Sequence, residues 1–355
     1  MVTIESKEHK SERTLTFSPE YKHPEATVDW IHPSVCELKG AYQNLISSGI
    51  LGPFIPLDDQ RLPPATQFSR GMRLKLPHTK DVIVVSGIGL VRSDEKDNKY
   101  NVHPPTEDLL NTKSGGIFFS TTIIDPETGK VITIEERSPF GGYWTKEMKD
   151  KVGNTQEAHK KLNSPQVIIP TVLAYGQISP KLGWLSYQFP EDTLPLKLLS
   201  SSDRFERELG PVPILEQFGK AIAKVNKAGL VHVQLHLGNW GYKIDRDHDD
   251  AISIVLRDWS LMQRRVNYGK REDWHLACKE GVLLAIERAR EGINPSYLSG
   301  TEITAKRKFL AVQAIITGYY LELGLNRDLF EKIFKEGIHN LDIDALVATC
   351  VKTLS

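Results

Sequence analysis

The pattern of hydrophobic and polar positions changes part-way along the chain. Between about residues 105 and 192, short runs of alternating or β-branched residues predominate, and they predict strands. Further on, apolar residues recur at helical spacing. In VPILEQFGKAIAKVNKAG, for example, Ile214, Phe218 and Ile222 share one face before Gly229 ends the helix. The order predicts an α+β protein with a small antiparallel sheet and one helix, followed by a larger helical body.

Several segments can be assigned by type. KSGGIFFSTTIID, PETGK and VITIEERS predict a glycine-headed antiparallel hairpin, and a charged helix, TKEMKDKVGNTQEAHKKL, follows it. VIIPTVLAYGQI and GWLSYQFPED predict two further strands. A second hairpin is expected from NWGYKI and ISIVLRDWS, on either side of an acidic turn. REDWHLACKEGVLLAIERAREG and RKFLAVQAIITGYYLELG predict amphipathic helices.

The first hundred residues have a weaker pattern. Residues 1 to about 30 are polar and are expected to be poorly ordered, 34–49 predict a helix with a glycine stop, and 50–80 predict irregular structure. DVIVVSGIGLVRS predicts a strand that enters a glycine turn. It does not fit a dinucleotide-binding motif, because the third glycine is missing and a charged turn stands where the helix should begin. A hairpin turn is the better interpretation.

Composition excludes several classes of partner. The 355 residues are 40% hydrophobic, and 45 basic residues balance 45 acidic ones, so we expect neither nucleic acid nor an acidic membrane surface as a partner. No apolar run approaches the roughly 18 residues of a membrane helix, and the charged amino terminus does not resemble a secretory signal. Three widely spaced cysteines suit a reducing compartment. A cytoplasmic protein without a cysteine-built zinc site is therefore predicted.

Polar residues gather in GLVHVQLHLGNWGYKI, directly after the predicted helix. His232 and His236 have the i, i+4 spacing that presents two imidazoles to a metal from a helix. Gly238 and the β-prone flanks favour a loop instead, and no third ligand stands at a suitable spacing. A zinc site is therefore disfavoured.

Asn239 and Asp258 suggest a different site. Each lies next to one strand of the second predicted hairpin, so the hairpin brings a neutral oxygen and a carboxylate together. Such hard oxygen ligands suit Mg²⁺ when phosphate oxygens complete its coordination.

The stretch AIAKVNKAGLVHVQLHLGNWGYKI with ISIVLRDWS resembles the catalytic and metal-binding loops of the protein-kinase-like superfamily, nearest its aminoglycoside and choline phosphotransferase branch. There the pattern is H-G-D-L-H-x-x-N followed by I-D-W or D-F-G. The resemblance implies that His232 opens the loop and that His236 is its second histidine. It also implies that Asn239 is a magnesium ligand and that Asp258 bridges magnesium to the nucleotide phosphates. ATP and Mg²⁺ are then the expected cofactors.

Other segments resemble the same family in order, over about residues 105 to 290. Gly115 and Gly116 fall in the glycine-rich loop, and Glu157 falls where helix C carries its glutamate. Gln188, in YQFPED, falls at the hinge that binds adenine, and Asp273 falls where a carboxylate usually holds the catalytic loop. The resemblance implies three parts: an N-terminal extension at 1–104, an N-lobe with hinge at 105–192, and a helical C-lobe at 193–355.

Two positions depart from the family pattern. Gln234 stands where the family has its catalytic aspartate, and an amide does not accept a proton near neutral pH. Glu135 or Glu136 stands where a lysine should meet the phosphates. Arg137, on the same strand face as Glu135, or Lys113, beside the glycine turn, is the candidate replacement.

Three functions remain open. An ATP-dependent phosphotransferase is favoured slightly, because the two predicted metal ligands are present and Gln234 can orient an acceptor hydroxyl, or His236 can act as base. A pseudokinase that serves as scaffold or regulator is the second. A kinase-like enzyme that transfers adenylate or activates a carboxylate is the third.

The acceptor is expected to be a small molecule or a peptide. The segment after Asp258 is short and has no A-P-E ending, as in small-molecule phosphotransferases. A basic cluster can meet an anionic substrate or simply be solvated, and the N-terminal extension is a candidate surface for a protein partner. The cluster comprises Arg264, Arg265, Lys270 and Arg271.

Overall fold

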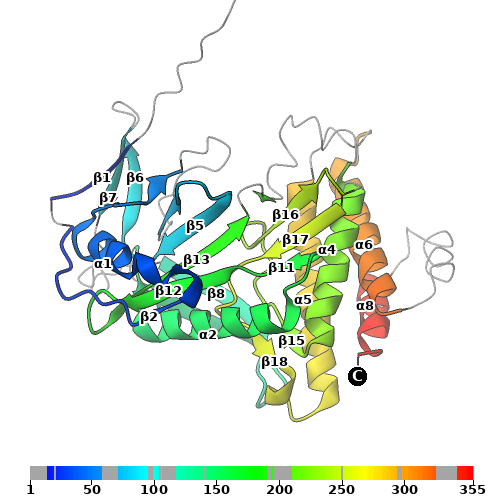
Figure 1. Ribbon diagram of the computed structural model, residues 1–355. Helices are drawn as coiled ribbons and strands as arrows, with labels where there is room; N and C mark the ends of the chain where they lie inside the picture. Colours follow the sequence, from blue (N-terminus) through cyan, green and yellow to red (C-terminus); the bar gives the residue numbers. More distant parts are fainter. Residues whose placement is uncertain are drawn as a thin grey trace, which may run out of the picture. The chain divides into compact units, whose positions relative to one another are not determined.

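The chain divides into two compact units (Figure 1). One comprises Met1–Phe118, Arg137–Met148 and Val172–Gln188, and the other comprises Phe119–Glu136, Lys149–Thr171 and Phe189–Ser355. A computed structural model describes residues 14–19, 21–57, 71–94, 99–103, 105, 117–138, 141–190, 193–195, 210–248, 251–293, 298, 300–324 and 342–354. Within these ranges, no helix combines the length and the apolar character needed to cross a bilayer.

The first unit is built on a seven-stranded sheet in the order β2-β12-β13-β5-β4-β3, with β10 paired to β13. Trp184 lies at its centre, fully buried, and stacks on Tyr42 at 5.7 Å between ring centroids. The strands are β2 (Trp30–Ile31), β3 (Ile55–Pro56), β4 (Gly71–Lys75), β5 (Asp81–Ser86), β10 (Tyr143–Trp144), β12 (Thr171–Gln177) and β13 (Leu182–Pro190). A 3-10 turn, η1 (Pro33–Leu38), leads into α1 (Lys39–Ser48), which Gly49 ends with a positive φ.

The N-terminal region is more ordered than its composition predicts. Tyr21 and Ala26 are buried, and Thr27 N–H donates to Gln177 O on the last residue of β12. The expectation of poor order for residues up to about 30 is therefore wrong for 14–19 and 21–30, because buried aromatic and backbone contacts compensate for the polar sequence. Likewise, β4 lies within the segment predicted to be irregular.

The glycine turn after β5 is not a hairpin turn. The β5 strand pairs with β4 and β13, whereas the strand after the turn belongs to a separate three-stranded sheet in the order β1-β7-β6. These strands are β1 (Thr14–Phe17), β6 (Leu90–Asp94) and β7 (Lys99–His103). Instead, β6 pairs with β7 in antiparallel register. Alternation of apolar and polar residues indicates a strand but does not show which other strand pairs with it. The predicted hairpin turn at these glycines is therefore wrong.

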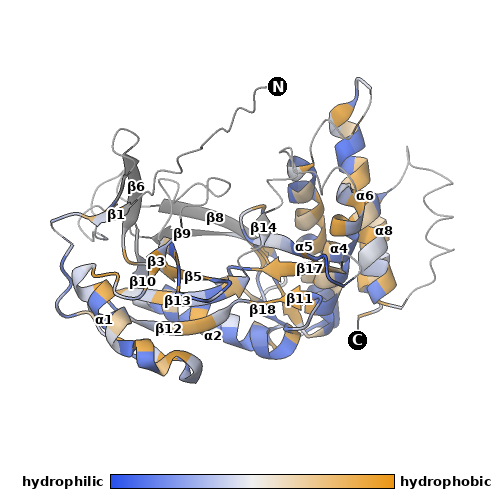
Figure 2. Cartoon of the chain, turned by 45° about the horizontal axis from the view of Figure 1, so that its top comes forward, coloured by the Kyte–Doolittle hydropathy of each residue, from blue (hydrophilic) through white to orange (hydrophobic). Residues whose placement is uncertain are grey.

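The second unit is mainly helical. A four-stranded sheet, β11-β17-β16-β14, accompanies the helices, and its strand β17 is apolar along most of its length (Figure 2). Its elements are β11 (Val167–Ile168), β14 (Leu194–Pro195), α4 (Pro211–Lys227), β15 (Leu230–Val231), β16 (Trp240–Asp245), β17 (Ala251–Leu256), β18 (Gln263–Arg264), η4 (Arg265–Asn267), α5 (Arg271–Gly292), α6 (Ile303–Glu322) and α8 (Ile343–Val351). The predicted apolar face of α4 is confirmed, because Ile214, Phe218 and Ile222 are all buried.

The α+β class is confirmed, and the second unit is mainly helical, as the sequence predicts. The predicted hairpin is present as β8 (Ile117–Ile124) and β9 (Val131–Ser138), and α2 (Thr145–Leu162) follows as expected. The glycines predicted to precede β8 lie outside the described residues. The β16 and β17 strands form the second predicted hairpin. The three-part division at 104/105 and 192/193 stays a prediction.

Close packing of α4 against α6 fixes the helix that leads into the polar loop. A Cβ added to Gly318 in α6 would overlap the carbonyl oxygen of Glu216 in α4. We expect Gly318→Ala to lower the free energy of unfolding by about 1–3 kcal/mol, since neither backbone can move away cheaply. Gly153→Ala in α2 is the control, because open space surrounds that position and alanine favours the helix by about 0.5–1 kcal/mol. Urea denaturation measures both, and equal effects would contradict this account.

Candidate functional site

The residues from His232 to Asn239 form a loop, as predicted, and not a helix. The α4 helix ends at Lys227, and Gly229 turns the chain with a φ of 73° into β15. The β15 strand pairs with β18 and so holds the start of the loop in place. His232 and His236 therefore do not stand one helical turn apart, which removes the zinc interpretation of their spacing.

His232 is buried and ties the loop to the end of β17. Its Nε2 lies 2.7 Å from the carbonyl oxygen of Arg257, and its Nδ1 accepts a hydrogen bond from Gln234 N–H at 3.3 Å. Both contacts fit the neutral ring with its proton on Nε2. Burial lowers the pKa of His232 to about 4, so the ring stays neutral near pH 7. His232 is therefore a positioning residue in this loop.

The β16–β17 hairpin brings Asn239 beside the residue before Asp258. Trp240 pairs with Leu256, and Arg257 N–H donates to Asn239 O at 2.7 Å. The buried side chain of Asn239 donates from Nδ2 to Gln234 O at 2.9 Å. This contact fixes the amide plane, and no described residue donates to its Oδ1.

Asp258 adopts a left-handed backbone conformation with a φ of 60°. That region is unfavourable for a residue with a side chain, and such strain gathers at functional sites. Its carboxylate oxygen Oδ1 lies 3.1 Å from Lys151 Nζ and accepts a hydrogen bond from Ser260 Oγ at 2.9 Å. The side chain of Lys151 is 10% exposed and that of Asp258 is 32% exposed, so the pair lies at the edge of the protein interior.

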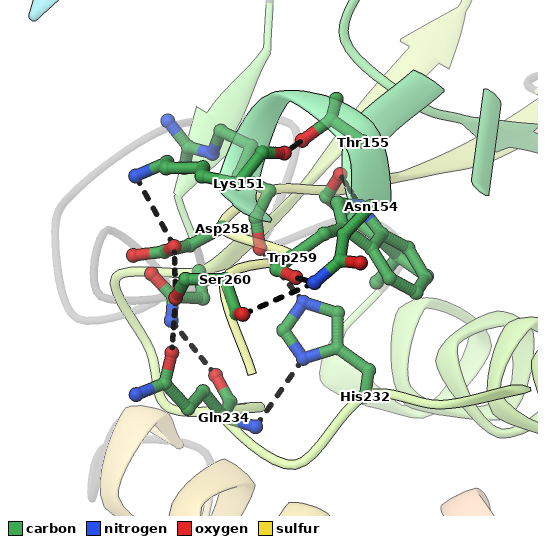
Figure 3. Close-up of polar contacts among 11 residues, drawn as sticks. Lys151, Asn154, Thr155, His232, Gln234, Asp258, Trp259 and Ser260 are labelled. Atoms are coloured by element: carbon green, nitrogen blue, oxygen red, sulfur yellow. Dashed lines mark hydrogen bonds and ion pairs between the residues drawn. The ribbon is translucent and has the colours of Figure 1, made fainter. Parts of the chain in front are cut away.

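A set of polar contacts connects these residues (Figure 3). Asn239 donates to the main-chain oxygen of Gln234, the side chain of Gln234 lies near Ser260, and both Ser260 and Lys151 contact the carboxylate of Asp258. Ser260 Oγ also lies 3.2 Å from Gln234 Oε1, yet a hydroxyl has one proton and the carboxylate is the nearer and stronger acceptor. With the Gln234 amide turned by 180°, Nε2 donates to Ser260 while Ser260 donates to Asp258. A glutamine satisfies this arrangement, whereas a second carboxylate would compete for the same proton.

Helix α2 anchors the turn that carries Asp258. The buried side chain of Asn154 donates from Nδ2 to the carbonyl oxygens of Trp259 at 2.9 Å and Ser260 at 3.1 Å. Its Oδ1 accepts from Arg264, whose guanidinium also meets Glu157 Oε2 at 2.7 Å. The backbone after Asp258 is thus fixed to α2 by a buried amide.

The structure brings together the predicted site residues Gln234, Asn239 and Asp258, but not all of the others. Glu157 pairs with Arg264 and Lys161. Partial burial alone would raise the pKa of Glu157, but hydrogen bonds from Lys161 and Arg264 outweigh it and the net pKa is lowered. Gln188 lies on β13 in the first unit and donates to the carboxylate of Asp81.

Three predicted phosphate contacts cannot be placed. Gly115, Gly116 and Lys113 lie outside the described residues, and only the backbone of Arg137, in β9, lies within them. The β9 side chains near Glu135 and Glu136 are likewise outside the described part of the chain.

Asp273 and the basic cluster make contacts other than those expected from the sequence. Asp273, in the first turn of α5, packs against Gly129 in the β8–β9 turn, and no described residue of the loop hydrogen-bonds to it. In the basic cluster, Arg264 meets Asn154 and Glu157, while Arg271 donates to Leu354 O at 2.7 Å. Those two arginines serve internal contacts.

His236 is exposed at the outer side of the loop. Its Nδ1 accepts a hydrogen bond from Gly238 N–H at 3.1 Å, so the neutral ring carries its proton on Nε2. The pKa of His236 is lowered, mainly because nearby protein atoms displace water from the ring. The charge of Asp258 opposes this effect, whereas Arg288 and Arg257 add to it. In this conformation the ring offers a donor to solvent, and its role as a base stays a prediction.

Sequence reasoning missed Lys151, Asn154 and Ser260. One signal was available: Lys151, Asn154 and Thr155 have i, i+3, i+4 spacing, and all three are buried on the inward face of α2. Buried polar residues on one face of a helix indicate that this face contacts polar groups and not only hydrophobic side chains.

No family model matches the sequence, and no curated protein matches it significantly. Among solved structures, the Rio2 kinase from Chaetomium thermophilum is similar at 12% identity and a TM-score of 0.37, over 81% of this chain and 70% of that one. The PknI kinase domain of Mycobacterium tuberculosis is similar at 11% identity and a TM-score of 0.35, over 87% and 99%. TM-scores this low do not assign a fold by themselves.

Proposed function

We propose that this chain is an ATP- and Mg²⁺-dependent transferase of kinase-like fold, and that it is a phosphotransferase acting on a small-molecule or peptide acceptor. The observation that carries the proposal is the network that joins Asn239, Gln234 and Asp258 at the open end of the β16–β17 hairpin. Gln234, Asn239 and Asp258, up to 24 positions apart in sequence, lie in one set of polar contacts, which supports the proposal.

The donor set fits Mg²⁺ bound together with a nucleotide. Asn239 offers a neutral amide oxygen and Asp258 a carboxylate, which are the hard oxygen ligands that Mg²⁺ prefers. No group of three or more His, Cys, Asp or Glu side chains suited to a metal occurs in the described part of the chain. Two protein ligands would leave the remaining coordination of Mg²⁺ to phosphate oxygens and water. When bound, Mg²⁺ would supply charge neutralisation on the phosphates.

The residues of the chain would position the acceptor rather than deprotonate it. Gln234 cannot take a proton near neutral pH, but its amide can orient a hydroxyl by a hydrogen bond. Transfer forms a bond between the acceptor oxygen and the γ-phosphorus while the bond to the bridging oxygen of ADP breaks, and the acceptor proton passes to solvent or phosphate. Loss of a general base costs about 10²–10⁴ in rate, so slow turnover is expected.

A pseudokinase is the second candidate, and Gln234 is the observation that favours it. The glutamine amide lies within hydrogen-bonding distance of Ser260, so it has a structural contact in addition to any role toward an acceptor. A chain that binds nucleotide without turnover would serve as a scaffold or regulator. Adenylyl transfer or carboxylate activation would use the same residues and differ in which phosphate is attacked.

Calorimetric titration with Mg·ATP tests the proposal. We expect saturable binding that weakens when Mg²⁺ is withdrawn with a chelator, and absence of binding would remove every enzyme interpretation. Incubation with ATP labelled at the α or the γ phosphate, with panels of metabolites and peptides, then separates the classes. Label transferred from the γ position indicates a phosphotransferase, label from the α position indicates adenylyl transfer, and no transfer favours the pseudokinase.

A further inference from the structure

Lys151 is a buried cation beside the proposed metal ligand Asp258. It lies on helix α2, from which the sequence predicts no contact with the phosphates. Its residue is 8% exposed, and its ammonium lies 3.1 Å from the carboxylate of Asp258. An ammonium removed from water costs free energy unless a counter-charge compensates for it. Asp258 is a compensating carboxylate in direct contact, which ties Lys151 to the proposed site.

The two cations that the sequence predicts for the phosphates, Arg137 and Lys113, have no described side chains. A nucleoside triphosphate carries more negative charge than one Mg²⁺ neutralises, and side chains share the remainder in phosphoryl-transfer sites. Strand β9 carries Glu135 and Glu136 where a lysine was expected. Lys151 is a buried amine in direct contact with a proposed metal ligand.

We propose that Lys151, from helix α2, is the residue that meets the nucleotide phosphates, a role that the sequence assigned to Arg137 or Lys113. This inference rests on the proposed function. An ammonium carries three donor hydrogens, so one lysine can contact the Asp258 carboxylate and a phosphate oxygen together. A phosphate held at Mg²⁺ lies next to the ligands of that ion, and Lys151 already touches one of them.

The remaining contacts of α2 keep Lys151 in place. Asn154, three residues further along the same face, is hydrogen-bonded to the backbone of Trp259 and Ser260. Ser260 in turn donates to the same carboxylate oxygen that Lys151 contacts. The lysine is therefore preorganised, and little side-chain entropy remains to be lost when a phosphate binds.

The test compares ADP with adenosine, because only ADP carries the phosphates. Dissociation constants for both are measured by NMR titration, with Mg²⁺, on the full chain and on Lys151→Met. We expect the affinity for ADP to fall about 10- to 100-fold, as for loss of a hydrogen bond to a charged group, while the affinity for adenosine is unchanged. Lys161→Met is the matched control, because Lys161 lies on the same helix but is 42% exposed and pairs with Glu157.

An unchanged affinity for ADP in folded Lys151→Met overturns the inference. An equal fall for ADP and adenosine also overturns it, since that result indicates a structural role. If the methionine variant does not fold, Lys151→Gln replaces it with the same expectations. Failure of the wild-type chain to bind either ligand is a separate result: it overturns the proposed function, and this inference with it.

Discussion

Asp258→Asn is expected to lower the affinity for Mg·ATP by roughly 100-fold or more. The amide has nearly the same shape but removes the negative charge that would face Mg²⁺, and about 100-fold corresponds to roughly 2.7 kcal/mol. The change also leaves the ammonium of Lys151 without its counter-charge at 3.1 Å. Calorimetric titration of the variant against the wild type measures the loss, and thermal unfolding measures the effect on the fold separately.

Asp247→Asn is the matched control for this experiment. Asp247 is exposed in the turn of the same hairpin, and the same substitution there removes a charge without touching the network. Its affinity for Mg·ATP should equal that of the wild type. Equal affinities in all three proteins, with the variants folded, would show that Asp258 is not a metal ligand.

Asn154→Leu is expected to lower the free energy of unfolding by about 3 kcal/mol. Leucine fills a similar volume but removes the donor to the carbonyl oxygens of Trp259 and Ser260 and the acceptor for Arg264. Unsatisfied buried polar groups cost about 1–3 kcal/mol each, and a charged group costs more. Urea denaturation measures the change.

The same variant should also weaken Mg·ATP binding, because Asn154 fixes the backbone that follows Asp258. Glu157→Gln is the control on the same helix: it keeps a side chain that can hydrogen-bond to Arg264 and leaves the Asn154 contacts in place. Its half-exposed ion pairs contribute about 1 kcal/mol or less. A loss below about 1 kcal/mol for Asn154→Leu would mean that the turn is held by other contacts.

Local pattern was sufficient for much of the second unit. The apolar face of α4, the glycine that ends it and the β16–β17 hairpin each depend on residues close together in sequence, and all were predicted. The candidate loop was found for the same reason, since Gln234 and Asn239 lie five positions apart. The hairpin then brought Asp258 near them.

Long-range contacts could not be predicted. Asn154 reaches carbonyl groups 105 and 106 positions later, and no periodicity encodes that pairing. In the first unit, β5 lies between β4 and β13, although β13 is about a hundred residues further along the chain. Strand partners of this kind depend on which apolar faces meet in space, so local sequence pattern does not determine the strand order within residues 14–103.

The left-handed backbone at Asp258 creates a trade-off at one residue. Glycine would adopt a φ of 60° without a clash of Cβ, whereas an aspartate pays a conformational cost there, although a smaller one than most residues with a side chain. Only the aspartate, however, offers a carboxylate to Lys151 and Ser260. The local backbone preference and the electrostatic requirement therefore favour different amino acids at position 258, and the chain gives up stability to keep the charge.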